Sequence, residues 1–482
     1  MKNKIKIILV VILVGFMTGC SESFLEEFPR LQQSDVLTFD TYDGLYKATA
    51  GTYDRLCGAG WYGAGFVITA DLKGGNAKRI LNSGRYVNEY LWINTPASTS
   101  GLWDDAYRTI ARANNVINVI DDGFEETGVD QADIDVLKGE CLFLRALSHW
   151  DLVRMYALPY SAGTGNLGVP VVLVTENGYP ARNTVGEVYT QIVADLIAAE
   201  AILPAVNHRD IGDEMGWATS WAAKALLAKV YLYEEDWANA AAKAGELIDV
   251  SAGFSLFTAA EYTTWDLGGH WGSAPGGDEI IFQVDGSESN NVHPWWEAIS
   301  YMVDPGGYGD IGTSVDLLNL YEVGDVRADL FIDPGLAAWP GEKWTLKYPG
   351  RLGGTPHREF NTPVLRLAEM YLIRAEAYLN TTGDALADYN AIRTNRGLAL
   401  ATTVTLADIY DERRRELNFE GNELFDLSRT GRSLDREDAN VAVNKDVAFT
   451  AGGSALDNYL WAMPIPIGEM DANVNMEQNP GY

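Results

Sequence analysis

Tryptophan is the residue type whose placement in this chain most suggests ligand chemistry. The sequence holds 14 Trp, and a subset stands in segments rich in Gly, Pro and Asp: Trp61, Trp265, Trp271, Trp295, Trp296, Trp339 and Trp344. A flat indole stacks on the apolar face of a sugar ring while nearby polar groups hydrogen-bond its hydroxyls. The pattern favours a binding site for a neutral, ring-shaped ligand. The other reading is that these side chains only pack the loops onto the scaffold.

Two stretches combine such tryptophans with polar neighbours. Trp61-Tyr62 lies between Gly60 and Gly63, where a core residue is not expected, and polar residues follow it. Trp295-Trp296 follows Asn290, Asn291 and His293, and only one of two adjacent side chains in an extended segment can face a ligand. The predicted ligand-binding residues are Trp61, Tyr62, Lys73, Asn76, Arg79, Trp265, Trp295, Trp296 and Tyr308.

Motifs for bond-breaking chemistry are weak. The five His are scattered, with no H-E-x-x-H, and no G-x-S-x-G is present. One G-x-G-x-x-G begins at Gly163, but Pro170 follows and blocks the helix that a phosphate loop needs. We therefore predict no metal, no cofactor and no enzymatic activity. A lipid-anchored glycoside hydrolase stays open, because the separation of two carboxylates cannot be seen in a sequence with 67 acidic residues.

The charge and the N-terminus set the compartment. The formal net charge is −31, which repels nucleic-acid phosphates and anionic lipid head groups. A basic start and an apolar run over 7–16 lead to Met17-Thr18-Gly19-Cys20, which looks like a bacterial lipobox with Met where Leu is more usual. We predict a signal peptide over 1–19 and a lipidated Cys20 that anchors the protein. The alternative is an ordinary secretory signal with a chance Cys. Of the other two cysteines, Cys141 is predicted to be a buried thiol.

The elements that must position these residues are mainly helices. Tetratricopeptide-type helix pairs are predicted at 220–250 and 369–396, because Ala and Tyr recur at the same offsets in both windows, with a generic helical hairpin as the alternative. Helical periodicity predicts further helices at 102–121, 134–156, 185–203 and 406–419. Thr184 and Glu187 form a capping box for the third of these. The region 253–363 is rich in Gly, Pro and aromatic residues, with one short strand predicted at 279–284. A single body over 20–482 therefore has helical parts at 20–252 and 364–482 around a loop-rich insert.

Several motifs resemble those of the SusD/RagB family of nutrient-binding outer-membrane lipoproteins of Bacteroidetes-type bacteria. They include an E-C-L-F-L-R-A helix in which Cys141 replaces the family's Ala, and L-R-L-A-E-M-Y-L-I-R-A-E-A-Y-L at 365–379. The matching stretches are 24–29, 140–146, 365–379, 390–398, 412–429, 464–466 and 478–482. The charged residues of these motifs, such as Arg366 and Glu416, are interpreted as ion pairs that join neighbouring helices.

The resemblance implies a mostly α fold, with four tetratricopeptide-type helix pairs in a right-handed superhelical scaffold around the variable insert. It also implies a cell-surface lipoprotein, anchored in the outer membrane by its N-terminal lipid, that binds an oligosaccharide. The partner it implies is a SusC-like TonB-dependent transporter, to which the glycan would be delivered. Some members bind peptides instead, and a scaffold protein that binds partner helices is a further reading.

Overall fold

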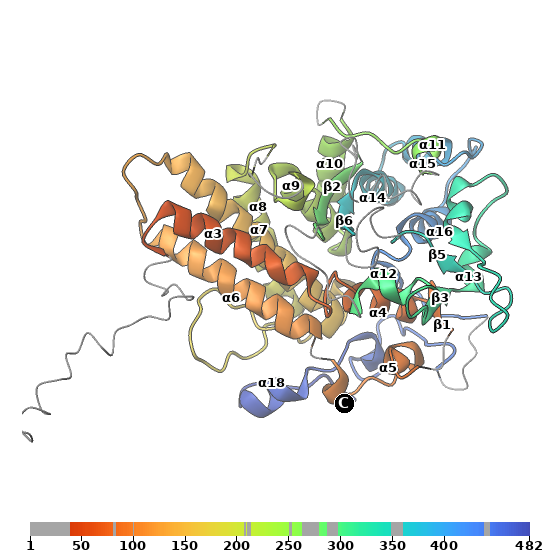
Figure 1. The fold of residues 1–482 in the computed structure, drawn as a ribbon, viewed down its shortest axis with the longest axis horizontal. Coiled ribbons are helices and arrows are strands. Elements are labelled where there is room, and N and C mark those ends of the chain that lie inside the picture. The colour runs from red at the N-terminus through yellow and green to blue at the C-terminus, as the bar shows by residue number, and fades with distance from the viewer. Residues whose placement is uncertain are drawn as a thin grey trace, which may run out of the picture.

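Long helices pack one against the next in chain order (Figure 1). α6 packs on α7, α7 on α8, α8 on α9, α9 on α10, α10 on α14, and α14 on α15, while α3 lies against α6 and α7. The bounds are α3 (Tyr42–Tyr53), α6 (Gly101–Asp121), α7 (Gln131–Tyr156), α8 (Val185–Ile202), α9 (Ser220–Tyr233), α10 (Trp237–Ile248), α14 (Leu367–Asn380) and α15 (Ala385–Asn395). This computed structural model describes residues 39–80, 83–99, 101–206, 209, 214–249, 253–262, 279–286, 297–348, 360–437 and 444–482.

Shorter elements cover one end of this array. The helices among them are α4 (Gly65–Gly74), α5 (Val87–Leu91), α11 (Ala259–Tyr262), α12 (Ile299–Met302), α13 (Val315–Leu318), α16 (Leu406–Leu417), α17 (Glu423–Arg429) and α18 (Ile467–Ala472). Over the described ranges, three antiparallel strand pairs accompany them: β1 (Ala77–Arg79) with β3 (Ile311–Thr313), β2 (Ile280–Val284) with β6 (Thr362–Arg366), and β4 (Phe331–Ile332) with β5 (Trp344–Thr345). β1 lies outside 253–363 and β6 runs past its end to Arg366, so strand pairing joins the insert to the helical parts on both sides.

Local capping signals explain where the helices begin. The Thr184 and Glu187 side chains cap α8 reciprocally, as predicted. Asp236 and Asp384 cap the second helix of each predicted pair, α10 and α15, by accepting a hydrogen bond from a backbone N–H three residues on. Both helix pairs therefore have a turn that ends in the same kind of cap.

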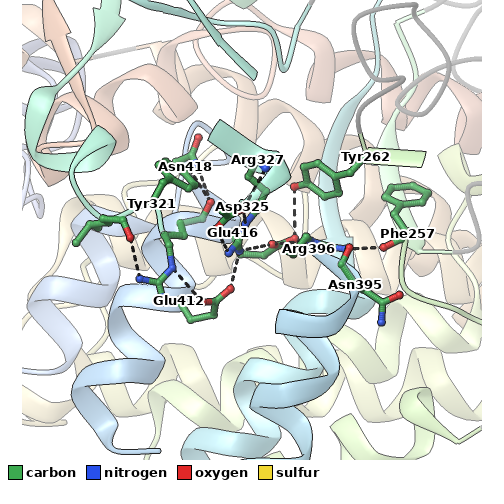
Figure 2. Close-up of polar contacts among 12 residues, drawn as sticks. Phe257, Tyr262, Tyr321, Asp325, Arg327, Asn395, Arg396, Glu412, Glu416 and Asn418 are labelled. Atoms are coloured by element: carbon green, nitrogen blue, oxygen red, sulfur yellow. Dashed lines mark hydrogen bonds and ion pairs between the residues drawn. The ribbon is translucent and has the colours of Figure 1, made fainter. Parts of the chain in front are cut away.

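A buried network of charges ties the insert to the C-terminal helices (Figure 2). Glu416 on α16 is the centre, because its carboxylate accepts hydrogen bonds from three arginines. In the part of the chain that the structure describes, five cations and five anions, each at least nine-tenths buried, form one connected set: Arg327, Lys347, Arg366, Arg396, Arg415, Glu279, Asp325, Glu412, Glu416 and Glu420. Burial alone would raise the pKa of Glu416, but the guanidiniums around it hold that pKa well below its usual range.

The structure confirms the mostly α fold and the two helix pairs. It also confirms the strand predicted at 279–284, which is β2. It also confirms that the charged motifs join elements to one another, although Arg366 ends β6 rather than lying within a helix. Cys141 is a buried free thiol, and burial raises its pKa to about 12. Within the described residues, no helix is both long and apolar enough to cross a bilayer. The predicted signal peptide and Cys20 fall outside those residues, and the four-pair superhelix stays a prediction.

Candidate functional site

The pairing of β1 with β3 brings together two segments that lie more than 200 positions apart. Arg79 at the end of β1 stands opposite Ile311 at the start of β3. The ladder continues one step further, where the Ile80 N–H donates to the Asp310 carbonyl over 2.9 Å. The segment that contains Tyr308 and Asp310 therefore lies beside the residues that follow Arg79.

A tight turn folds two tyrosines onto each other in the second segment. Asp304-Pro305-Gly306-Gly307 reverses the chain, and the Tyr308 N–H donates to the Tyr301 carbonyl over 2.8 Å. The rings of Tyr301 and Tyr308 meet edge to face, with their centroids 4.6 Å apart. Both side chains are half-buried, so part of this aromatic pair is open to solvent.

Arg85 connects the two segments. Its guanidinium lies 3.6 Å from the centre of the Tyr308 ring and donates to Asp310 Oδ2. The Ser83 hydroxyl donates to the same oxygen over 2.9 Å. The Arg79 Nε in turn donates to the Arg85 carbonyl over 2.9 Å, which fixes the backbone that carries Arg85. We call these six residues, Arg79, Ser83, Arg85, Tyr301, Tyr308 and Asp310, the tyrosine–arginine cluster.

One carboxylate oxygen of Asp310 accepts no hydrogen bond from the described residues. The residue is fully buried, and its Oδ1 atom has no partner among the described residues. A buried carboxylate oxygen without a donor is costly, so a ligand hydroxyl that reached it would be bound favourably. The cluster thus combines aromatic surface, guanidinium donors and a carboxylate acceptor, the three groups that hold a polyhydroxylated ring.

Trp61 and Tyr62 do not lie on an exposed loop, and that prediction is wrong. Both are buried, and the Trp61 indole N–H and the Tyr62 hydroxyl each donate to Asp151 Oδ2 over 2.7 Å. The flanking glycines serve close packing, because a Cβ at Gly60 would lie 2.3 Å from the backbone of Gly101.

Lys73 and Asn76, two more of the predicted ligand-binding residues, are buried as well. The Lys73 ammonium lies 3.6 Å from the centre of the Trp92 ring, and burial lowers its pKa to about 7. The Asn76 amide donates to Asp71 and accepts from Arg414, so it joins α4 to α16. These polar groups hold the core together and do not face solvent.

The other tryptophans divide into three groups. Trp344 is buried and donates to the Gly309 carbonyl over 3.0 Å, which supports the turn beneath Tyr308. Trp339 is half-buried. Trp265, Trp271, Trp295 and Trp296 lie outside the described residues.

Sequence reasoning nominated Arg79 and Tyr308 but missed the other four members of the cluster: Ser83, Arg85, Tyr301 and Asp310. The Asp-Pro-Gly-Gly turn was the available signal for Tyr301, since a turn of that kind brings its flanking residues together. No local signal marks Asp310, because its role depends on the pairing of two distant strands.

His, Cys, Asp and Glu are the side chains that most often hold a metal ion or transfer a proton in a site. No group of three or more His, Cys, Asp or Glu side chains there could hold a metal ion. His149 is buried, and burial lowers its pKa to about 3, so it is neutral at physiological pH. The G-x-G-x-x-G stretch forms a loop between α7 and α8, as predicted.

Known proteins share this architecture over most of its length. Residues 24–232 match a family model described as starch-binding associating with outer membrane, and residues 338–482 match the model of the SusD family. A SusD-like protein of Bacteroides ovatus is 25% identical over 89% of this chain and 82% of its own length. A SusD superfamily structure from Bacteroides vulgatus is 31% identical, with a TM-score of 0.80 over 92% of this chain and 99% of that one. A laminarin-binding SusD-like protein is 25% identical, with a TM-score of 0.73 over 92% of this chain and 100% of that one. The chain therefore belongs to the SusD family.

Proposed function

We propose that this protein binds a neutral glycan at the tyrosine–arginine cluster, without breaking bonds, and delivers it to a SusC-like TonB-dependent transporter. The observation that carries the proposal is the buried Asp310 Oδ1, which has no partner among the described residues and is set beside two half-buried tyrosines and the Arg85 guanidinium. The laminarin-binding relative supports a carbohydrate as the ligand class.

The geometry favours a neutral ligand over a charged one. Arg85 and Asp310 already neutralise each other through their ion pair. A glycan hydroxyl can donate to Asp310 Oδ1 and accept from a guanidinium, while the ring's apolar face lies on a tyrosine. A bound ion would instead have to compete with the internal pair.

The anchor and the transporter complete the proposal. Family membership associates the protein with the outer membrane, and we propose that lipids on Cys20 hold it at the cell surface. Ligand contacts from both this protein and the transporter would then favour a closed complex over an open one. Trp295 and Trp296 remain predicted contributors to the site, because they immediately precede Glu297 and the helix that carries Tyr301.

The test is isothermal titration of the mature chain, from Cys20 onward in detergent, with laminarin, starch and other oligosaccharides. We expect heat with at least one glycan and about a five- to 150-fold loss of affinity in Tyr308→Ala, taking the about 1–3 kcal/mol that an aromatic side chain contributes by stacking on a nucleobase as the guide. Tyr179→Ala is the matched control, since Tyr179 is an exposed tyrosine outside the cluster.

Heat with peptides and none with any glycan would replace the proposal with a peptide-binding function. Release of sugar products from a polysaccharide by the pure protein would contradict the absence of catalysis. Co-purification from membranes with a TonB-dependent barrel tests the partner, and a chain that never co-purifies with one would refute that part.

A further inference from the structure

A cavity of about 360 Å³ lies where the turn between α9 and α10 meets α14, α16 and α17. It shares no residue with the tyrosine–arginine cluster. Its lining is Ser161, Ala162, Leu232, Tyr233, Glu235, Trp237, Glu376, Asn380, Tyr410, Arg429, Thr430, Gly431, Phe449, Ala451 and Gly452. Ser161, Glu235 and Asn380 are exposed at its mouth, so the cavity opens to solvent.

An internally neutralised ion pair forms part of its wall. Arg429 donates to both oxygens of Glu376, over 2.7 and 2.8 Å, and both side chains are buried. Each carboxylate oxygen can still accept a second hydrogen bond. The pair thus offers polar contacts without a net charge.

Tyr233 adds a hydroxyl group to the wall of the cavity. Its side chain is 2% exposed, and its hydroxyl has no hydrogen-bond partner among the described residues. Burial raises the pKa of Tyr233, so the hydroxyl keeps its proton and can donate it. A buried hydroxyl of this kind gains most from a ligand oxygen.

Aromatic rings supply the apolar part of the lining. Trp237 is half-buried at the start of α10, and Tyr410 is half-buried on α16. The guanidinium of Arg432 lies 4.4 Å from the Tyr410 ring centre, and that of Arg429 lies 5.3 Å from the Tyr233 ring centre. These cations disfavour a cationic ligand on the tyrosines, while Glu235 and Glu376 disfavour an anionic one.

We propose that this cavity is a second carbohydrate subsite that takes a single sugar ring, with Trp237 as its stacking surface and the Tyr233 hydroxyl as a hydrogen-bond donor. Its volume is at the small end of ligand sites, which span about 300–1,000 Å³, so it suits one ring rather than a chain. The choice of a sugar rests on the proposed glycan function, whereas the neutral polar character of the ligand rests on the cavity itself.

The test uses 19F NMR of the mature chain labelled with 5-fluorotryptophan, with the Trp237 resonance assigned by its loss in Trp237→Phe. Glucose, galactose, mannose and xylose are the probes. We expect at least one of them to shift the Trp237 resonance, and Tyr233→Phe to weaken that binding about three- to tenfold, as the loss of one hydrogen bond does. Tyr233→Phe should fold normally, because the hydroxyl it removes has no partner among the described residues.

Trp221 is the internal control, since it is half-buried on the partner helix α9 but does not line the cavity. A Trp237 resonance unmoved by every probe would overturn the subsite, as would equal affinity in Tyr233→Phe and the parent chain. If oligosaccharide binding is then lost in Tyr308→Ala all the same, the proposed function survives and only the second subsite falls.

Discussion

Neutralising Glu416 should destabilise the whole protein, because one carboxylate serves three buried arginines. Its Oε1 atom accepts from Arg366 at 2.5 Å and from Arg396 at 2.8 Å, and its Oε2 atom accepts from Arg327 at 2.8 Å and from Arg396 at 3.0 Å. Glu416→Gln keeps the volume but turns one acceptor into an amide donor that faces guanidinium N–H groups. Among the described residues, the network changes from five anions and five cations to four anions and five cations.

The expected cost is about 3–5 kcal/mol, the usual range for removing one partner of a buried ion pair. With an unfolding entropy of about 2.1 cal/mol/K per residue, a chain of 482 residues should lose about 3–5 °C in Tm. Thermal unfolding followed by circular dichroism at neutral pH measures this shift. The control is Glu322→Gln, which breaks a pair with Arg393 in which the Glu322 side chain is 46% exposed, and which should cost at most about 1 kcal/mol. Equal shifts in the two variants would refute the claim that the network holds the insert in place.

Three further predictions concern the core, the pH dependence and the anchor. Trp61→Phe removes a buried hydrogen bond to Asp151 together with ring volume. We therefore expect a loss of about 2–4 kcal/mol in unfolding free energy and an unchanged glycan affinity. Weakened glycan binding with unchanged stability would instead identify Trp61 as a ligand contact. Burial raises the pKa of Glu423 to about 7 from 4.5, so its contribution to stability is complete below about pH 4.5 and is lost as the pH rises through 7. Glu423→Gln should therefore have a higher unfolding free energy than the parent at pH 8, by on the order of 3 kcal/mol. Denaturant unfolding at pH 8 and pH 4 measures this difference, and an equally large advantage at pH 4 would contradict the assignment. Cys20→Ala should move the protein from the membrane fraction to the soluble fraction of fractionated cells, and continued membrane retention would exclude a lipid at Cys20 as the anchor.

The helices were predictable because their signals are local. Thr184 with Glu187, and the acidic caps of α10 and α15, act within one turn of the residues they cap. The glycines around Trp61 show the limit of such reasoning. A Gly beside an aromatic residue indicates either a free loop or a close approach of two backbones, and only the distant Gly101 decides between them.

The candidate site was predictable only in part, for the same reason. Arg79 and Tyr308 were nominated from composition, but Arg85 and Asp310 meet through a strand pairing across more than 200 residues. Lys73 was misplaced because a lysine after an apolar run normally reaches solvent, whereas here the Trp92 ring covers it.

The tyrosine–arginine cluster is divided between the segment around the end of β1 and the segment just before β3, and this division has a practical consequence. The stretch that ends at Arg85 supplies the guanidinium, and the stretch from Tyr301 to Asp310 supplies the Tyr308 ring beneath it, so neither stretch holds both. Glycan binding would then report whether the two segments have come together correctly. A truncated or misfolded product could keep its helices and its circular dichroism spectrum but would not bind the glycan.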